Sequence, residues 1–405
     1  MEIYNFLVER IEGSGAFHFK QNKYNCKFIF EIYSNGYKTL HLDGNFNLCY
    51  RIVKNILFKG KTDAGVVFSC DAHLNGFSTD TKKGCYKLSF LVINAELNNG
   101  NFKKGTKNIS YILYNLDLGG IRCNYNIFIN NRNMHLYPYS FKNSYKLLKM
   151  YGGRQVTAIC GYESKTTYAS PELLQNLLYL ISFLKGNFVG IDEIQIYQDT
   201  HYRRIFFNYK TYSYGNEGII HNLDDFGEII NSTHKNYENV IKRINRFNDL
   251  IEIYLECLRN TIIESQMAMV AVLFEGLKAR YINSNLIIEK KWIINKKNKR
   301  EKVKKSFEEL LIEIFNLEKF KYNKQQLRSL ICLRNNIIHE ASYTTRENSF
   351  NFKDALQIYL QSLNLFERFV CHLIKYTGNY WQKSAKGYKY VTLKKRTPKI
   401  SNKNP

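Results

Sequence analysis

The spacing of apolar residues changes once along this chain, and that change limits the fold to a sheet followed by helices. In the first half, short segments alternate between apolar and polar residues, which is the period of a half-buried strand. From about Asn236 onward, apolar residues recur every three or four positions, as in an amphipathic helix. We therefore predict an α+β protein with a β-rich N-terminal domain and an all-helical C-terminal domain.

The first half contains at least six candidate strands that are rich in β-branched and aromatic residues. They cover residues 26–34, 38–44, 64–72, 85–93, 110–118 and 125–130. The pairs Asn35-Gly36 and Asn99-Gly100 mark turns between strands. Because no helical segment separates these strands, the pattern predicts an antiparallel sandwich or barrel.

A helix and a hairpin complete this expected N-terminal domain, residues 1–232. Ser170 is a candidate N-cap and Pro171 fits the first helical position, so a helix is predicted over residues 170–185, ending at Gly186. Residues 188–210 alternate in polarity on both sides of Asp199-Thr200, which predicts a hairpin.

Five helices are predicted for a domain at residues 233–380. They comprise one long helix from about residue 236 to 258, and helices near 261–281, 306–317, 324–340 and 352–377. The run from Met267 to Phe274 is apolar on nearly all sides, so the second helix is expected at the centre of the bundle.

Positive charge is concentrated in this second half. The net charge is +24, and residues 233–405 contain 33 Lys and Arg against 16 Asp and Glu. Lys and Arg bind phosphate groups largely independently of sequence, so this distribution favours a polyanionic partner such as RNA. The alternative is a Lys-rich composition inherited from an AT-rich genome, which explains the total charge better than its clustering.

Two segments carry the densest positive charge. Residues 290–305 contain nine basic residues and one acidic residue and are predicted to form an exposed loop, in which Trp292 either stacks on a base or packs on the bundle. The loop provides the candidate RNA-binding residues Lys296, Lys297, Lys299 and Arg300. Residues 381–405 are basic and are predicted to be a disordered tail.

The candidate catalytic residues are Arg334, Asn335 and His339, within the sequence ICLRNNIIHEAS. An imidazole can move the proton of a ribose 2'-hydroxyl near neutral pH, and a guanidinium can stabilise the charge on an attacked phosphate. One cation and one imidazole are therefore sufficient for cleavage of RNA without a metal.

Helix geometry places Arg334 on the apolar stripe of Leu327, Ile331 and Ile338, where a permanent charge needs a partner. Glu275 is a candidate partner, although a glutamate at the helix surface is an equal interpretation. His339 lies about 140° further round the helix. The alternative to catalysis is a buried structural arginine paired with a carboxylate, followed by a surface histidine.

The segment LRNNIIHE resembles the signature of HEPN-domain ribonucleases, in which an arginine and a polar residue precede a histidine. The resemblance implies a helical bundle that dimerises, so that two motifs face one cleft. It assigns cleavage to Arg334 and His339 and an orienting role to Asn335. The order of a β-rich region before such a bundle is similar to that of ApeA-like abortive-infection proteins. It implies an antiviral role, with host RNA, including tRNA, as the substrate and a phage-derived activator at the N-terminal domain.

Other classes of function have less support. A catalytically silent RNA-binding or dimerisation module fits the same basic segments, while a DNA-binding regulator lacks a helix-turn-helix signal. The nine Cys lack paired metal-ligand spacing, and neither a metal nor another cofactor is expected. The odd number of Cys and the absence of a signal-like N-terminus favour the cytoplasm. No apolar run approaches the length of a membrane span.

Overall fold

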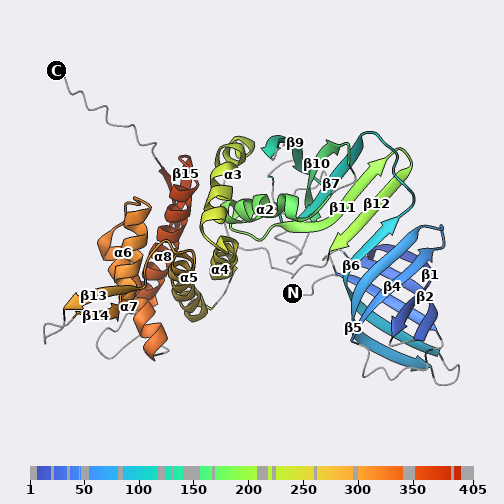
Figure 1. Ribbon diagram of the computed structural model, residues 1–405, viewed down its shortest axis with the longest axis horizontal. Coiled ribbons are helices and arrows are strands. Elements are labelled where there is room, and N and C mark those ends of the chain that lie inside the picture. Colours follow the sequence, from blue (N-terminus) through green and yellow to red (C-terminus); the bar gives the residue numbers. More distant parts are fainter. Residues whose placement is uncertain are drawn as a thin grey trace, which may run out of the picture. The chain divides into compact units, whose positions relative to one another are not determined.

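The computed structural model of the chain (Figure 1) describes residues 7–19, 22–33, 37–44, 46, 54–80, 85–116, 118, 124–129, 131–139, 156–166, 169–207, 218–220, 225–259, 262–294, 300–340, 352–384 and 387–393. The chain divides into two compact units. The first is a β unit, residues 1–175 with 189–214, and the second is a helical unit, residues 176–188 with 215–405.

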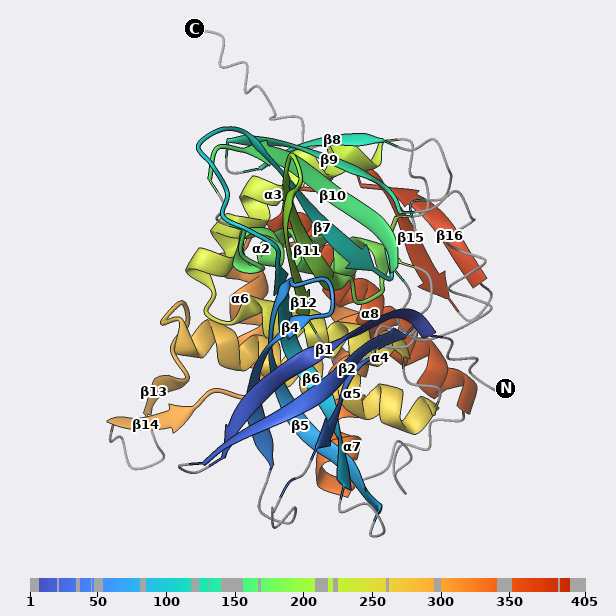
Figure 2. The same ribbon diagram turned by 90° about the vertical axis from the view of Figure 1, so that its right-hand side faces the viewer.

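The β unit begins with six antiparallel strands that close on themselves. Hydrogen bonding follows the order β3-β2-β1-β4-β5-β6, and β3 also pairs with β6, so this part of the sheet is barrel-like. Figure 2 shows β1 and β2 crossing the face nearest the viewer. The strands are β1 (Leu7–Phe19), β2 (Asn22–Tyr33), β3 (Lys38–Gly44), β4 (Asn55–Thr62), β5 (Val67–Asp80) and β6 (Cys85–Asn98).

Strand β6 belongs to two parts of one sheet. Its segment Tyr86–Leu91 pairs with β3, whereas Asn94–Asn98 pairs with β12, from which the sheet continues. The order beyond β6 is β12 (His201–Phe207), β11 (Gly190–Gln198), β7 (Lys107–Tyr114), β10 (Val156–Ser164), β9 (Arg132–Pro138) and β8 (Tyr125–Ile129). The predicted hairpin is confirmed as β11–β12, with Asp199 in the left-handed region at φ 51°.

Phenylalanine rings fill the inside of the barrel-like part. Phe28 lies 5.1 Å from Phe58 and 4.8 Å from Phe68 between ring centroids, and all three are buried. Every second residue of β2 from Cys26 to Ile32 is buried, as the alternating sequence requires. The prediction of a β-rich, barrel-like N-terminal half is therefore confirmed.

The helical unit contains seven helices in its described part. They are α2 (Glu172–Lys185), α3 (Phe226–Arg243), α4 (Phe247–Arg259), α5 (Ile263–Asn283), α6 (Phe307–Leu317), α7 (Lys324–Glu340) and α8 (Phe352–Leu373). The start and stop signals of α2 act as predicted, since Ser170 Oγ accepts from the Glu172 amide at 3.3 Å and Gly186 has φ 63°. No helix in the described part of the chain is long and apolar enough to cross a membrane.

Most of α2 belongs to the helical unit, whereas its predicted place was the N-terminal domain. Leu180, Phe183 and Leu184 are fully buried in the same apolar cluster as the later helices. Short-range signals fix where a helix starts and stops, but its apolar face packs according to tertiary contacts. The expected boundary at residue 233 therefore differs from the observed division.

The long helix predicted over residues 236–258 is wrong, because the chain breaks between α3 and α4. Ile244 is extended at φ −111° and ψ 104°, and Arg246 has φ 57°. Ile244 and Phe247 are both buried and keep a helical spacing across the break, so periodicity cannot detect it.

Helix α5 has a deeply buried face but is not enclosed on all sides. Met267, Val270 and Phe274 are fully buried, whereas Val272 within the same apolar run is 48% exposed. Gly276 allows α4 to approach closely, since a Cβ there would lie 2.9 Å from Leu250 Cδ2. Helix α5 was expected at the centre of the bundle. Only one of its faces is buried there, and the face with Val272 is exposed to solvent.

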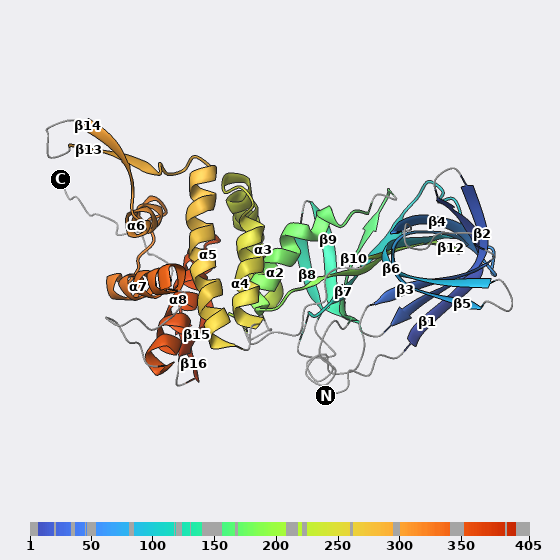
Figure 3. The same ribbon diagram turned by 90° about the horizontal axis from the view of Figure 1, so that it is seen from below.

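Two basic segments form hairpins, contrary to the sequence prediction. The expected loop at 290–305 is the hairpin β13 (Lys290–Ile294) and β14 (Arg300–Lys304), which projects from the helices in Figure 3. The start of the expected disordered tail is the hairpin β15 (Asn379–Ser384) and β16 (Gly387–Thr392). Dense charge marks exposure but does not exclude a β-ladder, whose hydrogen bonds use backbone groups.

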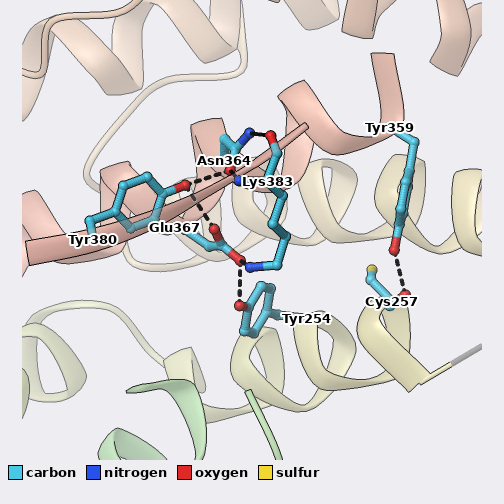
Figure 4. Close-up of polar contacts among 7 residues, drawn as sticks. All are labelled: Tyr254, Cys257, Tyr359, Asn364, Glu367, Tyr380 and Lys383. Atoms are coloured by element: carbon cyan, nitrogen blue, oxygen red, sulfur yellow. Dashed lines mark hydrogen bonds and ion pairs between the residues drawn. The ribbon is translucent and has the colours of Figure 1, made fainter. Parts of the chain in front are cut away.

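A buried polar network attaches the C-terminal hairpin to α8 (Figure 4). The Glu367 carboxylate, fully buried, accepts from Lys383 Nζ at 2.5 Å, from the Tyr254 hydroxyl at 2.5 Å and from the Tyr380 hydroxyl at 2.8 Å. Asn364 Nδ2 donates to the Lys383 carbonyl, and its Oδ1 accepts from the Lys383 amide. Burial and the nearby carboxylate raise the pKa of both tyrosines well above its ordinary value. Residues 379–384 are thus an integral part of the bundle.

We predict that Lys383→Met lowers the free energy of unfolding of the helical unit by about 3 kcal/mol, because it leaves the buried Glu367 carboxylate without its cation. The measurement is urea denaturation followed by far-UV circular dichroism at 222 nm. Lys389→Met is the matched control, since Lys389 is exposed on β16. Equal midpoints for the two variants would show that the network does not stabilise the bundle.

Candidate functional site

Arg334 lies on α7 and is held against α5 by a carboxylate. Its Nε donates to Glu275 Oε1 at 2.8 Å, and its Nη2 donates to the same oxygen. The side chains of Arg334 and Glu275 are 16% and 25% exposed, so the pair is largely but not completely shielded from water. Of the two interpretations of Glu275, a partner of Arg334 or a surface glutamate, the structure shows the pairing with Arg334.

Glu275 also accepts from Lys278 Nζ, one helical turn further along α5. Burial acts to raise the pKa of Glu275, but hydrogen bonds and charge interactions with Lys278 and Arg334 outweigh it and lower the pKa. The carboxylate is therefore ionised at neutral pH. Because two cations share one carboxylate, the Glu275–Lys278–Arg334 cluster keeps one net positive charge.

An aromatic ring supports the two cations of this cluster. Arg334 Cζ lies 4.8 Å and Lys278 Nζ 5.6 Å from the centroid of the Phe307 ring. Phe307 is the first residue of α6, where Ser306 and Glu309 form a capping box: Ser306 Oγ accepts from the Glu309 amide, and Glu309 accepts from the Ser306 amide at 2.7 Å. The capped helix start thus holds the ring against the guanidinium.

The guanidinium keeps donors for a ligand. Arg334 Nη1 donates to Asn335 Oδ1 at 2.9 Å, and the two bonds to Glu275 use Nε and Nη2. A guanidinium has five N–H groups, so with respect to the described residues Nη1 and Nη2 each retain one. Asn335 is exposed and contacts the arginine directly. This arrangement orients the guanidinium and leaves it able to bind an oxyanion.

His339 belongs to the same helix, but its side chain lies outside the described part of the structure. Helix α7 continues from Lys324 to Glu340 without a break, so its backbone at His339 is helical. In a regular helix, residues five positions apart differ by about 140° around the axis. The backbone positions of Arg334 and His339 in one chain therefore lie on different sides of α7.

The first turn of α6 also anchors the basic hairpin. Lys291, on β13, donates to Glu309 of the capping box. The neighbouring Trp292 is 62% exposed and lies opposite Lys302, whose Nζ is 5.8 Å from the ring centroid. Trp292 therefore does not pack on the bundle, which was one of its two expected roles, and its ring faces solvent beside a cation.

Only one of the expected RNA-binding residues is described. Arg300 begins β14 and is exposed. Lys296, Lys297 and Lys299 lie outside the described residues. Among the residues that are described, no three or more His, Cys, Asp or Glu side chains are grouped as a metal site requires.

Two residues around Arg334, Lys278 and Phe307, were not predicted from the sequence. Lys278 had a detectable signal, because its position three residues after Glu275 places both on one helix face. The sequence signal for Phe307 was weaker. Ser306 and Glu309 mark the start of a helix, but this pattern does not show what the side chain of Phe307 contacts. That contact exists only because α6 packs beside α5 and α7.

Comparison with protein-family models gives no match, and neither curated proteins nor solved structures yield a similar protein. The functional argument therefore depends on the residues of this chain.

We predict that Glu275→Gln reduces stability by roughly 1–2 kcal/mol at neutral pH, because Arg334 and Lys278 lose a charged acceptor. The pKa of Glu275 is lowered in the folded protein. Its stabilising effect is thus present above the ordinary carboxyl pKa and is lost as the pH falls through the lowered value. Denaturation midpoints measured between neutral and acidic pH should converge for the variant and the wild type. A difference that persists at the most acidic pH would contradict the ion-pair explanation.

Proposed function

We propose that this protein is a metal-independent endoribonuclease of the HEPN type, acting through Arg334, Asn335 and His339. The main observation behind the proposal is that the first turn of α6 contacts both the Arg334 side chain and the basic hairpin β13–β14. Phe307 there supports the Arg334 guanidinium, and Glu309 binds Lys291 beside the exposed Trp292. The first turn of α6 thus holds two parts in place: the basic hairpin, which is suited to binding RNA, and the Arg334 guanidinium, which is suited to binding a phosphate.

The proposed reaction requires a base, an acid and a phosphate-binding group. One His339 imidazole takes the proton of the ribose 2'-hydroxyl, and the 2'-oxygen attacks the adjacent phosphorus. The bond from phosphorus to the 5'-oxygen breaks, and that oxygen takes a proton from water, which acts as the acid. The products are a 2',3'-cyclic phosphate and a 5'-hydroxyl. Arg334 stabilises the pentacoordinate phosphate through its two remaining N–H groups.

The proposed active unit is a two-fold dimer. Because Arg334 and His339 of one chain lie about 140° apart around α7, a single copy does not present both groups to one phosphate. Two copies of α7 across a symmetric interface allow the arginine of one chain to act with the histidine of its partner.

The motif's resemblance further supports a role in abortive infection. In this proposal the β unit senses a phage-derived activator, and the helical unit then cleaves host RNA, with tRNA as one substrate, in the cytoplasm. A sensing role requires an inactive ground state whose population the activator shifts. The net positive charge of the Glu275 cluster is compatible with such an RNA substrate.

One observation favours a second function, that of a silent RNA-binding and dimerisation module. The Arg334–Glu275 pair satisfies the arginine without any ligand, as a structural ion pair would. The basic hairpin serves binding equally well in both cases. The two functions differ in whether RNA is cleaved and whether toxicity in cells depends on His339.

We predict that wild-type protein cleaves tRNA in EDTA and that His339→Ala slows cleavage by roughly 10²- to 10⁴-fold, the usual contribution of a general acid or base. Arg334→Ala should slow it by about 10²- to 10³-fold. Arg328→Ala is the matched control, because Arg328 is an exposed arginine on the same helix. Product ends are identified by mass spectrometry. Equal cleavage by all variants, or no cleavage after activation in infected cells, would reject the proposal.

Mixed dimers test whether each site uses groups from both chains. Co-expression of His339→Ala with Arg334→Ala chains should restore about a quarter of the wild-type activity if each site uses one group from each chain. Half of the dimers are then mixed, and each contains one intact site. A site completed within one chain would show no restoration.

We also predict that Trp292→Ala weakens RNA binding by roughly tenfold, which corresponds to the loss of one stacked base. Cleavage at saturating RNA should change little, because the ring supports binding rather than chemistry. Fluorescence anisotropy measures the affinity. Ile288→Ala, at a position 67% exposed just before β13, is the control. Unchanged affinity in Trp292→Ala would remove the hairpin from the RNA-binding surface.

A further inference from the structure

The outer face of the barrel-like part contains a hollow of about 940 Å³ that is surrounded by lysines. Strands β1, β2 and β4 form most of it, with the end of β3 at one side. Its lining includes four lysines and one carboxylate: Lys23, Lys27, Lys59, Lys61 and Asp43. All of these residues lie within the β unit, far in sequence from the motif on α7.

Strand register places cations on both sides of β1. Ser14 pairs with Lys27 on β2 and with Lys61 on β4, while Ala16 pairs with Lys59 on β4. Neighbouring strands are about 4.8 Å apart, so the β2 and β4 backbones are separated by roughly 10 Å across β1. Residues two apart on one strand are about 7 Å apart. Lys23 and Lys27 are four positions apart on β2, which is about 13 Å. The four lysines therefore surround an area of roughly 10 by 13 Å.

The floor between these lysines has little side-chain volume. Ser14 and Ala16 are small, and Gly15 and Gly60 face each other in the β1–β4 pairing. A Cβ at either glycine would collide with the backbone of the opposite strand. The close approach of β1 and β4 thus excludes larger residues at these two positions, so backbone atoms form this part of the floor.

The positive charge around this hollow is not neutralised. Lys23, Lys27, Lys59 and Lys61 are exposed, and none of them has an ion pair with another described residue. Asp43 is the one acidic residue of the lining. Four like charges at this spacing repel one another, and a multivalent anion would remove that repulsion.

A second hollow of about 830 Å³ adjoins the first and has a different character. The two share Ser14, Lys27 and Asp43 in their linings. The second hollow adds Glu12, Asp63, His41 and Lys87, so it offers hydrogen-bond acceptors together with donors. One ligand could thus place an anionic group over the lysines and an uncharged, hydrogen-bonding group beside the carboxylates.

We propose that these adjoining hollows bind a nucleoside polyphosphate, with its phosphoryl groups among Lys23, Lys27, Lys59 and Lys61. Clustered phosphoryl groups match the compact set of ammonium groups. The ribose and base supply hydroxyl and amino donors for Asp43 and Glu12. A nucleic-acid strand fits less well, because its phosphates are spread out and none of the described lining residues presents an exposed aromatic ring for stacking. This inference concerns binding alone and does not depend on the nuclease proposal.

Isothermal titration calorimetry of the full chain with ATP, in low salt and without divalent cations, tests the site. We expect one ATP per chain, with Lys27→Gln and Lys61→Gln each weakening binding by roughly tenfold through the loss of a charge-assisted hydrogen bond. Ser14→Phe should weaken binding strongly, because Ser14 lines both hollows and the ring would occupy the place where they join without changing the charge. The double variant Lys103→Gln/Lys104→Gln removes two exposed lysines of the same unit outside the linings and should bind as the wild type does.

Three results would overturn the proposal. The first is no binding at millimolar ATP. The second is binding that the lining variants and the control variant weaken equally, which would indicate attraction to the overall charge. The third is tighter binding of a uridine decamer that depends on the same lysines, which would assign the hollow to a nucleic-acid strand. Unchanged melting temperatures of the variants exclude unfolding as the cause.

Discussion

The geometry of the candidate site depends on a single carboxylate at the point where three helices meet. Glu275 on α5 binds Arg334 of α7 and its own neighbour Lys278, and both cations lie over Phe307 of α6. An ion pair of this kind adds little stability when it is fully solvated and is costly when it is fully buried and incomplete. The intermediate exposure observed here lets Glu275 orient the guanidinium while water and ligands still reach it.

The same region shows how a charged surface is given a fixed shape. Residues 290–305 are too polar to form a core, yet their backbone groups pair in β13 and β14, and Lys291 fastens the hairpin to the capping box of α6. The exposed Trp292 is therefore presented on a defined element, and less conformational entropy is lost when a ligand binds to it. The hairpin β15–β16 is held more firmly, through the buried Glu367 network.

The β unit obtains its stability and its candidate ligand site from opposite faces of the same strands. Inward residues of β2 and β4 are aromatic or aliphatic and form a continuous core with Phe28, Phe58 and Phe68. Outward residues of these strands supply the lysines around the hollow. Alternation in a strand separates the two functions, so a change at a surface lysine leaves the core intact.

The sequence by itself determined what short-range physics controls. Alternating polarity fixed the β-rich first half, Ser170 and Gly186 fixed the limits of α2, and the motif helix follows its apolar spacing. It also identified Glu275 as a possible partner of Arg334. Only the tertiary structure decided that α2 packs with the later helices, that the chain breaks at Ile244–Arg246, and that Phe307 lies against the guanidinium. The reason is that periodicity records which side of an element avoids water, whereas the identity of the group opposite that side is set by packing between residues far apart in the chain.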